Sequence, residues 1–126
     1  MAELFYRAVL EVRRSNNLTI TGSSLPFWHY FAPTSDLSAG SSYTSVDAQF
    51  ENALSSIEGW ADAFVRRIKY HTPADQRMTE QYSRNDGTAT GAQDLTWSYA
   101  SLITAAIARA TLRNDTGYIE LVANLQ

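Results

Sequence analysis

Two neighbouring segments, residues 80–87 and residues 94–100, carry the clearest chemistry in the chain. The first reads EQYSRNDG and the second reads DLTWSYA. A carboxylate such as Glu80 can take a proton from water, and an indole such as Trp97 offers an apolar face on which a sugar ring stacks. On residue type alone, a single glutamate in a loop is usually a solvated surface group. A carboxylate beside a tryptophan is a pairing that a carbohydrate site needs, but these residue types alone do not decide between the two interpretations.

The composition is that of a folded globular unit. The chain has 126 residues, of which 44% are hydrophobic, and its formal net charge is -3. This balance differs from that of a disordered segment. Its 10 basic and 13 acidic residues form no cluster of like charge, so we expect no nucleic acid partner. A run of about 18 apolar residues is also absent, so we expect no contact with a membrane.

Residue types that hold metals are scarce. The chain contains no cysteine, which excludes a disulfide framework, a thiolate nucleophile and a cysteine-based zinc site. The two histidines, His29 and His71, lack the spacing of metal ligands. We therefore expect neither a metal site nor a cofactor.

The sequence does not assign the protein to a cellular compartment. Sequons at Asn17 and Asn114 would be used only in a protein that enters the secretory pathway. The first residues hold Glu3 and Arg7, where a signal peptide would have a basic region and then a continuous apolar one. The sequence therefore predicts no secretion signal and leaves the localisation unknown.

Hydrophobic periodicity predicts a helical chain. Apolar residues recur at three- and four-residue spacing over residues 2–14 and 46–70, as in helices that bury one face, and residues 95–110 form a further helix that is apolar nearly all round. A short aromatic helix is expected at residues 25–31, with Ser24 as its N-cap. Two tryptophans at helical apolar positions, Trp28 and Trp60, are expected in the core.

The helix ends carry further expectations. No Ser, Thr, Asp or Asn precedes the first helix, which is typical of a helix whose beginning is missing. Residues 44–47 offer a capping signature for the long helix, and Asp94 is expected to cap the final one. The final helix has almost no polar face, so we expect burial on several sides. Glu51 and Glu58 share a helix face and are expected to be solvated charges.

Residues 74–93 show no sustained periodicity. The triplet at residues 85–87, Asn-Asp-Gly, favours a two-residue hairpin reversal. This excursion from the helices could present side chains to a cleft. The tail at residues 116–126 is short and mixed, and the pattern does not assign it.

The order of these elements and the amino-acid sequence of residues 80–100 resemble the closing segment of the catalytic domain of fungal and yeast glucoamylases, glycoside hydrolase family 15. The resemblance extends nearly to Ala110. It implies an all-α fold, about the last quarter of an (α/α)6 toroid of six inner and six outer helices. A long carboxylate-bearing loop would precede the final helix. Residues 1–126 would then be a single unit, a C-terminal fragment of that domain.

The resemblance implies an inverting hydrolase that releases glucose from the non-reducing ends of starch and maltooligosaccharides. Glu80 matches the family's general base, which takes a proton from the attacking water. Gln81 and Trp97 match positions expected to bind the sugar. Gly91 departs from the pattern, because many family members carry a serine there whose hydroxyl can bond the base carboxylate.

A larger departure is the absence of the general acid. An inverting pair holds its two carboxyls roughly 6.5 to 9.5 Å apart, and no second carboxylate here matches the family's acid. The resemblance therefore implies a truncated piece that is inactive alone. Its apolar helix faces would also lead it to self-associate.

Two other functions remain open on the residues. One is a non-enzymatic helical module that binds glucan or a protein partner without turnover. The other is an all-α adaptor without sugar chemistry, in which Glu80 and Trp97 could both be replaced without effect.

Overall fold

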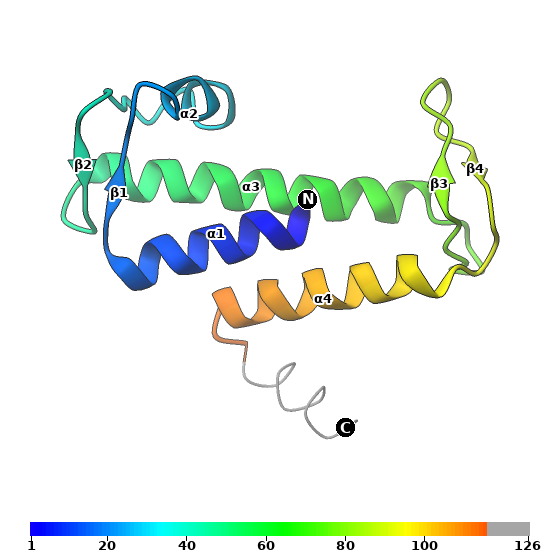
Figure 1. Ribbon diagram of the computed structural model, residues 1–126. Coiled ribbons are helices and arrows are strands. Elements are labelled where there is room, and N and C mark those ends of the chain that lie inside the picture. Colours follow the sequence, from blue (N-terminus) through cyan, green and yellow to red (C-terminus); the bar gives the residue numbers. More distant parts are fainter. Residues whose placement is uncertain (116–126) are drawn as a thin grey trace.

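The computed structural model describes residues 1–115, which form four helices and two small antiparallel sheets. The unassigned tail at residues 116–126 lies outside the described residues. In chain order the elements are α1 (Ala2–Ser15), β1 (Leu18–Thr19), α2 (Leu25–Phe31), β2 (Ser42–Tyr43), α3 (Ala48–His71), β3 (Gln81–Tyr82), β4 (Ala89–Thr90) and α4 (Thr96–Leu112) (Figure 1). The predicted order of helices is confirmed.

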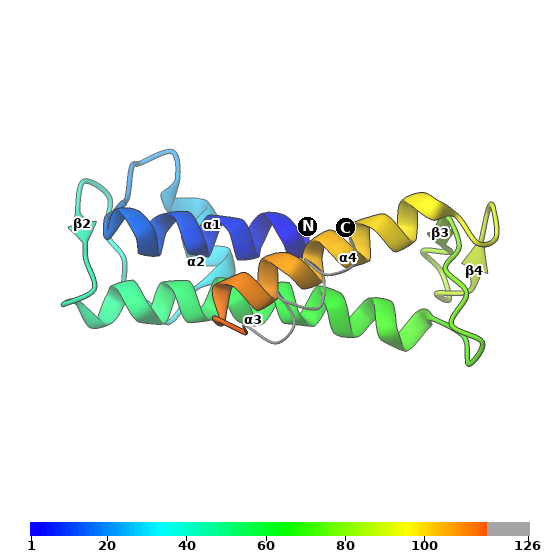
Figure 2. The same ribbon diagram turned by 90° about the horizontal axis from the view of Figure 1, so that it is seen from below.

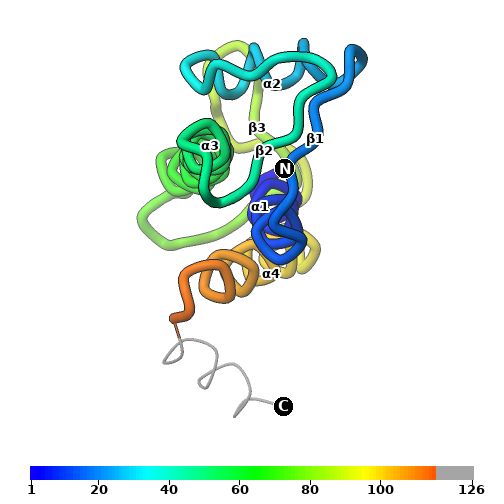
Figure 3. The backbone as a smooth tube through the Cα atoms, turned by 90° about the vertical axis from the view of Figure 1, so that its left-hand side faces the viewer, coloured from blue at the N-terminus to red at the C-terminus, as the bar shows by residue number. Residues whose placement is uncertain are grey.

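The first helix is the centre of the packing. It contacts both α3 and α4, and the end-on view shows the three helices as separate rods with α1 beside each of the others (Figure 3). Tyr6 and Val9 of α1 are fully buried, as are Phe50 and Leu54 of α3 to within 1%. The predicted apolar stripes of α1 and α3 thus meet in one core.

The long α3 helix spans the molecule from the β1–β2 sheet at one end to the β3–β4 hairpin at the other (Figure 1, Figure 2). It begins two residues later than expected, so Val46 is 90% exposed instead of joining the stripe. Asp47 holds the N-cap position, but its carboxylate accepts the N–H and hydroxyl of Thr44 and not a helix amide.

The short α2 helix packs on α3, and its aromatic residues make part of this contact. Ser24 occupies the N-cap position, yet its hydroxyl accepts the N–H of Thr21 and makes no bond to the helix. Trp28 packs against the core and is partly buried, close to expectation. Trp60 is 38% exposed, so the expectation that it lies in the core is wrong. Its indole N–H donates to the carbonyl of Phe31 in α2 at 3.1 Å, which keeps it at the edge of the core.

The final helix differs most from expectation. Its N-cap position is Leu95 and not Asp94, and no side chain caps it. Trp97 is 78% exposed and Ile103 is 51% exposed, so the helix is not buried on several sides. The reason is that, of the described helices, only α1 packs along it extensively.

The hairpin at residues 81–90 is confirmed, with Gln81 opposite Thr90 in the ladder. The two-residue reversal is wrong, because the last ladder bond joins Ser83 to Thr88 and leaves residues 84–87 as the loop. Gly87 has φ +74°, and a Cβ there would lie 2.1 Å from a ring carbon of His71. Glycine at this position lets the loop close onto the end of α3.

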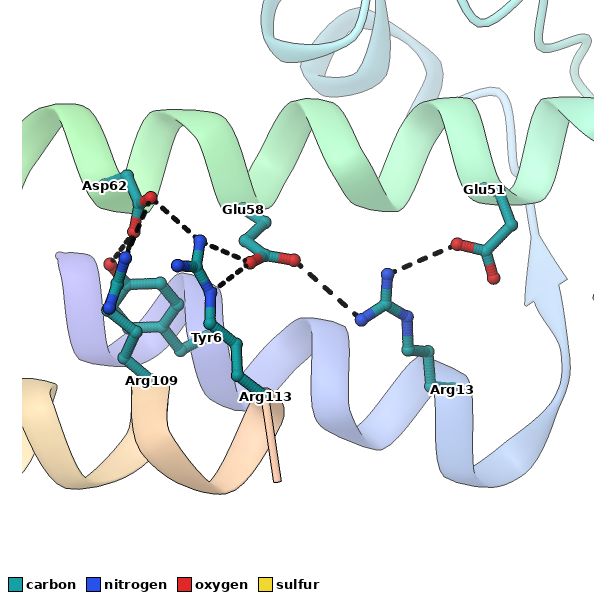
Figure 4. A network of polar contacts seen from close by, with 7 residues as sticks. All are labelled: Tyr6, Arg13, Glu51, Glu58, Asp62, Arg109 and Arg113. Carbon is teal, nitrogen blue, oxygen red and sulfur yellow. Dashed lines mark hydrogen bonds and ion pairs between the residues drawn. The ribbon is translucent and has the colours of Figure 1, made fainter. Parts of the chain in front are cut away.

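A polar network joins α1, α3 and α4 (Figure 4). Asp62 accepts the hydroxyl of Tyr6 at 2.5 Å, and the guanidinium groups of Arg109 and Arg113 at 2.8 and 2.9 Å. Burial alone would raise the pKa of Asp62, but the hydrogen bonds from Arg109 and Tyr6 outweigh it and lower that pKa to about 2. Burial and the neighbouring carboxylate raise the pKa of Tyr6.

Two glutamates of α3 extend the network. Glu58 accepts Arg113 at 2.8 Å and lies 3.8 Å from Arg13, and its side chain is only 18% exposed. The expectation of a solvated Glu58 is therefore wrong. The sequence could not show that Arg13 of α1 and Arg113 at the end of α4 lie beside this part of α3. Glu51 is half exposed and pairs with Arg13 at 3.2 Å.

Candidate active site

A hollow of about 730 Å³ lies at the end of the molecule where the hairpin meets the start of α4. Glu80 and Gln81 line it from the hairpin, Trp97 and Ser98 from α4, and Glu3 from α1. The three site residues predicted from the sequence thus border one cavity, although they come from different elements. Their roles stay predictions.

The Glu80 side chain lies over the opposite strand of the hairpin. Its backbone N–H donates to the carbonyl of Ala92 at 2.9 Å, and its Oε2 accepts the N–H of Ala92 at 3.3 Å. Gly91 has φ +79°, and a Cβ there would lie 2.7 Å from Oε2 and 2.9 Å from Cβ of Glu80. A serine at this position could be accommodated only if the carboxylate moved. Glycine therefore lets the carboxylate approach the backbone.

The other two predicted residues present their side chains outward. Trp97 stands in the first turn of α4 with most of its indole open to solvent. Gln81 is exposed on β3 beside Glu80. An indole and an amide on one rim are a pair that can stack on a sugar ring and hydrogen-bond its hydroxyls.

Glu3 is a second carboxylate at the hollow that sequence reasoning did not single out. It accepts the hydroxyl of Thr104 at 2.6 Å and the Nε of Arg7 at 2.8 Å. These two hydrogen bonds, from Thr104 first, lower the pKa of Glu3 below its usual value. A carboxyl that stays ionised cannot deliver a proton, so Glu3 does not suit the part of a general acid. No sequence signal could have found it, because the contact depends on α1 lying against α4.

Ser98, Tyr99 and Asp94, in and just before the first turn of α4, take part in hydrogen bonds with one another or with the backbone of residues 78–79. The Ser98 hydroxyl donates to the carbonyl of Thr79 at 2.9 Å. The Tyr99 hydroxyl accepts the N–H of Met78 at 3.0 Å and donates to Asp94 at 2.9 Å. Sequence reasoning noted this aromatic block but assigned Asp94 to capping. The hydrogen bonds from Ser98 and Tyr99 to residues 78–79 could not be predicted from the sequence pattern, because these residues are far apart in the chain.

Solved structures define the class of fold. The chain superposes on the "Glycoside Hydrolase Family 15 Glucoamylase from Hypocrea jecorina" with a TM-score of 0.80 and 36% identity, over 88% of this chain and 18% of that one. It superposes on the glucoamylase of Hormoconis resinae with a TM-score of 0.79 and 32% identity, over 88% of this chain and 19% of that one. The fold is therefore a part of an (α/α)6 toroid, as predicted.

A family model for glycosyl hydrolases family 15 matches residues 1–107, and the chain belongs to this family. It is 50% identical to a glucoamylase of Blastobotrys adeninivorans, over 99% of this chain and 20% of that protein. It is 39% identical to glucoamylase 1 of Rhizopus oryzae, over 86% of this chain and 18% of that protein. The chain thus spans about a fifth of the length of these relatives, and the predicted glucoamylase resemblance is confirmed.

Within residues 1–115, none of the helices combines the length and apolarity needed to cross a bilayer. The same part of the chain contains no group of three His, Asp or Glu side chains arranged to hold a metal ion.

Proposed function

We propose that this chain is the closing part of a glucoamylase-type hydrolase that acts on starch and maltooligosaccharides, with Glu80 as its general base. The observation that carries the proposal is that Glu80, Gln81 and Trp97 border one hollow in a chain of glycosyl hydrolases family 15. A carboxylate at an open cavity can reach a water molecule, which a buried structural glutamate could not do.

In the proposed reaction, Glu80 takes a proton from a water as that water attacks the anomeric carbon of the terminal glucose. The bond from that carbon to the leaving oxygen breaks on the opposite face, and a carboxylic acid protonates this oxygen. Attack opposite the leaving group inverts the configuration. Glu3, with its lowered pKa, does not suit this part, and we place the acid in the larger part of such an enzyme that this chain does not span. The chain alone then supplies half of the catalytic pair.

Trp97 and Gln81 would bind the sugar in this scheme. The exposed indole of Trp97 gives the apolar ring face a stacking surface, and the amide of Gln81 can both donate to and accept from sugar hydroxyls. Because Trp97 is so exposed, its contribution to binding can be separated from any contribution to folding.

We also infer that the chain self-associates when it stands alone. Leu4 of α1 is 59% exposed, and Ile103 and Trp97 of α4 are more than half exposed. Large apolar side chains exposed in this way favour association in water.

A chimera tests the catalytic proposal. The part of this chain that superposes on the Hypocrea jecorina glucoamylase replaces the corresponding segment of that enzyme, so that the rest of the enzyme supplies the toroid. We expect glucose release from maltotriose, and Glu80→Gln should reduce kcat by about 10²- to 10⁴-fold, the usual contribution of a general base. Glu11→Gln is the matched control, because Glu11 is exposed and pairs only with Arg14 among the described contacts. Equal activity of the two variants would contradict the proposal.

A further inference from the structure

Glu80 adjoins a hairpin that has little stability of its own. The β3 and β4 strands form two residue pairs, Gln81 with Thr90 and Tyr82 with Ala89. A two-stranded hairpin is at best marginally stable in water. A general base must nevertheless hold its carboxylate within a fraction of an ångström of a productive position. Contacts outside the hairpin must therefore fix the backbone of Glu80.

The backbone just before the hairpin is bonded to the start of α4. The Met78 carbonyl accepts the N–H of Leu95 at 3.0 Å, and the Thr79 carbonyl accepts the Ser98 hydroxyl at 2.9 Å. The N–H of Met78 donates to the Tyr99 hydroxyl at 3.0 Å. Met78 is itself only 6% exposed. The chain therefore lies against α4 immediately before it reaches the candidate base.

The Tyr99 hydroxyl has a second partner that orients it. While it accepts the N–H of Met78, it donates its own proton to Oδ1 of Asp94 at 2.9 Å. The carboxylate fixes the direction of the O–H bond and leaves an oxygen lone pair for Met78. Tyr99 does not border the hollow, so it would act on a bound sugar only through other residues.

The backbone of Asp94 explains why it does not cap α4. Its φ is +54°, in the left-handed region that aspartate tolerates better than most residues. The helix consequently starts after Leu95 without a side-chain cap. The carboxylate expected at the helix amides is bonded to Tyr99 instead.

We propose that Tyr99, oriented by Asp94, is a positioning residue for Glu80. It holds residues 78–80 against the start of α4, and it thereby sets the place of the Glu80 carboxylate relative to Trp97. This inference rests on the proposed function, because a positioned base has meaning only in a hydrolase.

The chain contains a matched control for this contact. The Tyr43 hydroxyl accepts the N–H of Ser38 at 3.1 Å, which is the same type of bond at the opposite end of the molecule. Tyr43→Phe and Tyr99→Phe therefore each remove one hydroxyl from one backbone amide. They differ in whether that amide leads to Glu80, and Tyr99→Phe also removes the donor to Asp94.

The first experiment measures backbone order in the 126-residue chain by NMR relaxation. In Tyr99→Phe, we expect the order parameters of residues 78–80 to fall from about 0.85 to below about 0.6, the range of flexible backbone. Tyr43→Phe should loosen Ser38 and leave residues 78–80 rigid. Asp94→Asn keeps an acceptor oxygen and should match the wild type. Should Tyr99→Phe fail to fold, Asp94→Ala asks the same question, because it removes the partner that orients the hydroxyl.

The second experiment measures kinetics in the chimera described above. Because Tyr99 does not touch the sugar, Tyr99→Phe should lower kcat about tenfold and change KM less than about twofold. Tyr43→Phe should change neither constant. If residues 78–80 stay as rigid in Tyr99→Phe as in Tyr43→Phe, or if kcat is equal in the two variants, the inference is wrong while the proposed function stands. A wild-type chimera that releases no glucose would count against the proposed function itself, and the order parameters would still decide whether Tyr99 holds the segment.

Discussion

The hydroxyl of Tyr6 donates to the carboxylate of Asp62 at 2.5 Å, and this contact joins the fully buried face of α1 to the middle of α3. Arg109 and Arg113 approach the same carboxylate from α4. Asp62 of α3 therefore forms hydrogen bonds to side chains of both α1 and α4. Its loss should affect the packing of all three helices.

Replacing Asp62 should destabilise the chain more than replacing an exposed partner of the same network. Asp62→Ala leaves the Tyr6 hydroxyl and Arg109 without their acceptor and leaves Arg113 with Glu58 alone, and we expect the free energy of unfolding to fall by about 1 to 3 kcal/mol. Glu51→Ala removes a half-exposed pair with Arg13, which should cost at most about 1 kcal/mol. Urea unfolding of both variants measures the difference. Equal losses would show that the position of Asp62 carries no special weight.

Acid should weaken the fold through the same residue. The pKa of Asp62 is about 2 in the folded chain, below its ordinary value of 3.8, so the unfolded chain binds more protons between these values. The stability that ionised Asp62 provides is therefore fully present above about pH 4 and is lost as the pH falls toward 2. Because the group is partly exposed, we expect this contribution to be about 1 to 2 kcal/mol. Unfolding of wild type and Asp62→Asn from pH 5 to pH 2 isolates it as a difference in slope, and parallel curves would exclude it.

A side chain at position 91 should displace the candidate base. Gly91 has φ +79°, and a Cβ would meet the Glu80 carboxylate at 2.7 Å, so Gly91→Ala should cost about 1 kcal/mol and move Glu80. Gly59→Ala is the control, because Gly59 lies in α3 with open space at its Cβ position. That change should stabilise the chain by up to about 1 kcal/mol. Thermal unfolding gives both signs, and a neutral Gly91→Ala would mean that the carboxylate does not need the space.

Trp97 and Trp60 should separate binding from folding. Trp97→Ala should leave the free energy of unfolding within about 0.5 kcal/mol of wild type, because the indole is 78% exposed. It should raise the KM of the chimera for maltotriose, because the change removes the aromatic face on which the sugar ring would stack. Trp60→Ala should instead destabilise the chain, because Trp60 bonds the backbone of Phe31 in α2. Unchanged KM in Trp97→Ala would remove Trp97 from the site.

The isolated chain should associate through its apolar helix faces. Sedimentation velocity over a range of concentrations should show species larger than the 14.0 kDa monomer. Ile103→Glu should shift the distribution toward monomer, because Ile103 is half exposed on α4. Val46→Glu is the control at an exposed position outside the helices. A monodisperse wild-type monomer at all concentrations would contradict the inference.

The residues by themselves determined the helices and the candidate site. Three- and four-residue spacing of apolar side chains is a local property of the chain, so α1, α3 and α4 could be predicted closely. The hairpin followed from its turn residues. Glu80, Gln81 and Trp97 followed from the resemblance, because it is carried by consecutive residues.

Only the tertiary structure decided how the polar side chains are used. Asp94 bonds Tyr99 instead of capping α4, and Glu58 is paired instead of solvated. The same holds for the close approach of Glu80 to Gly91 and for the exposed face of α4. Each of these depends on which segments distant in the sequence lie side by side. Hydrophobic periodicity shows that a helix buries a face, but the partner of that face, and the hydrogen bonds that follow, are set by the packing of the whole fold.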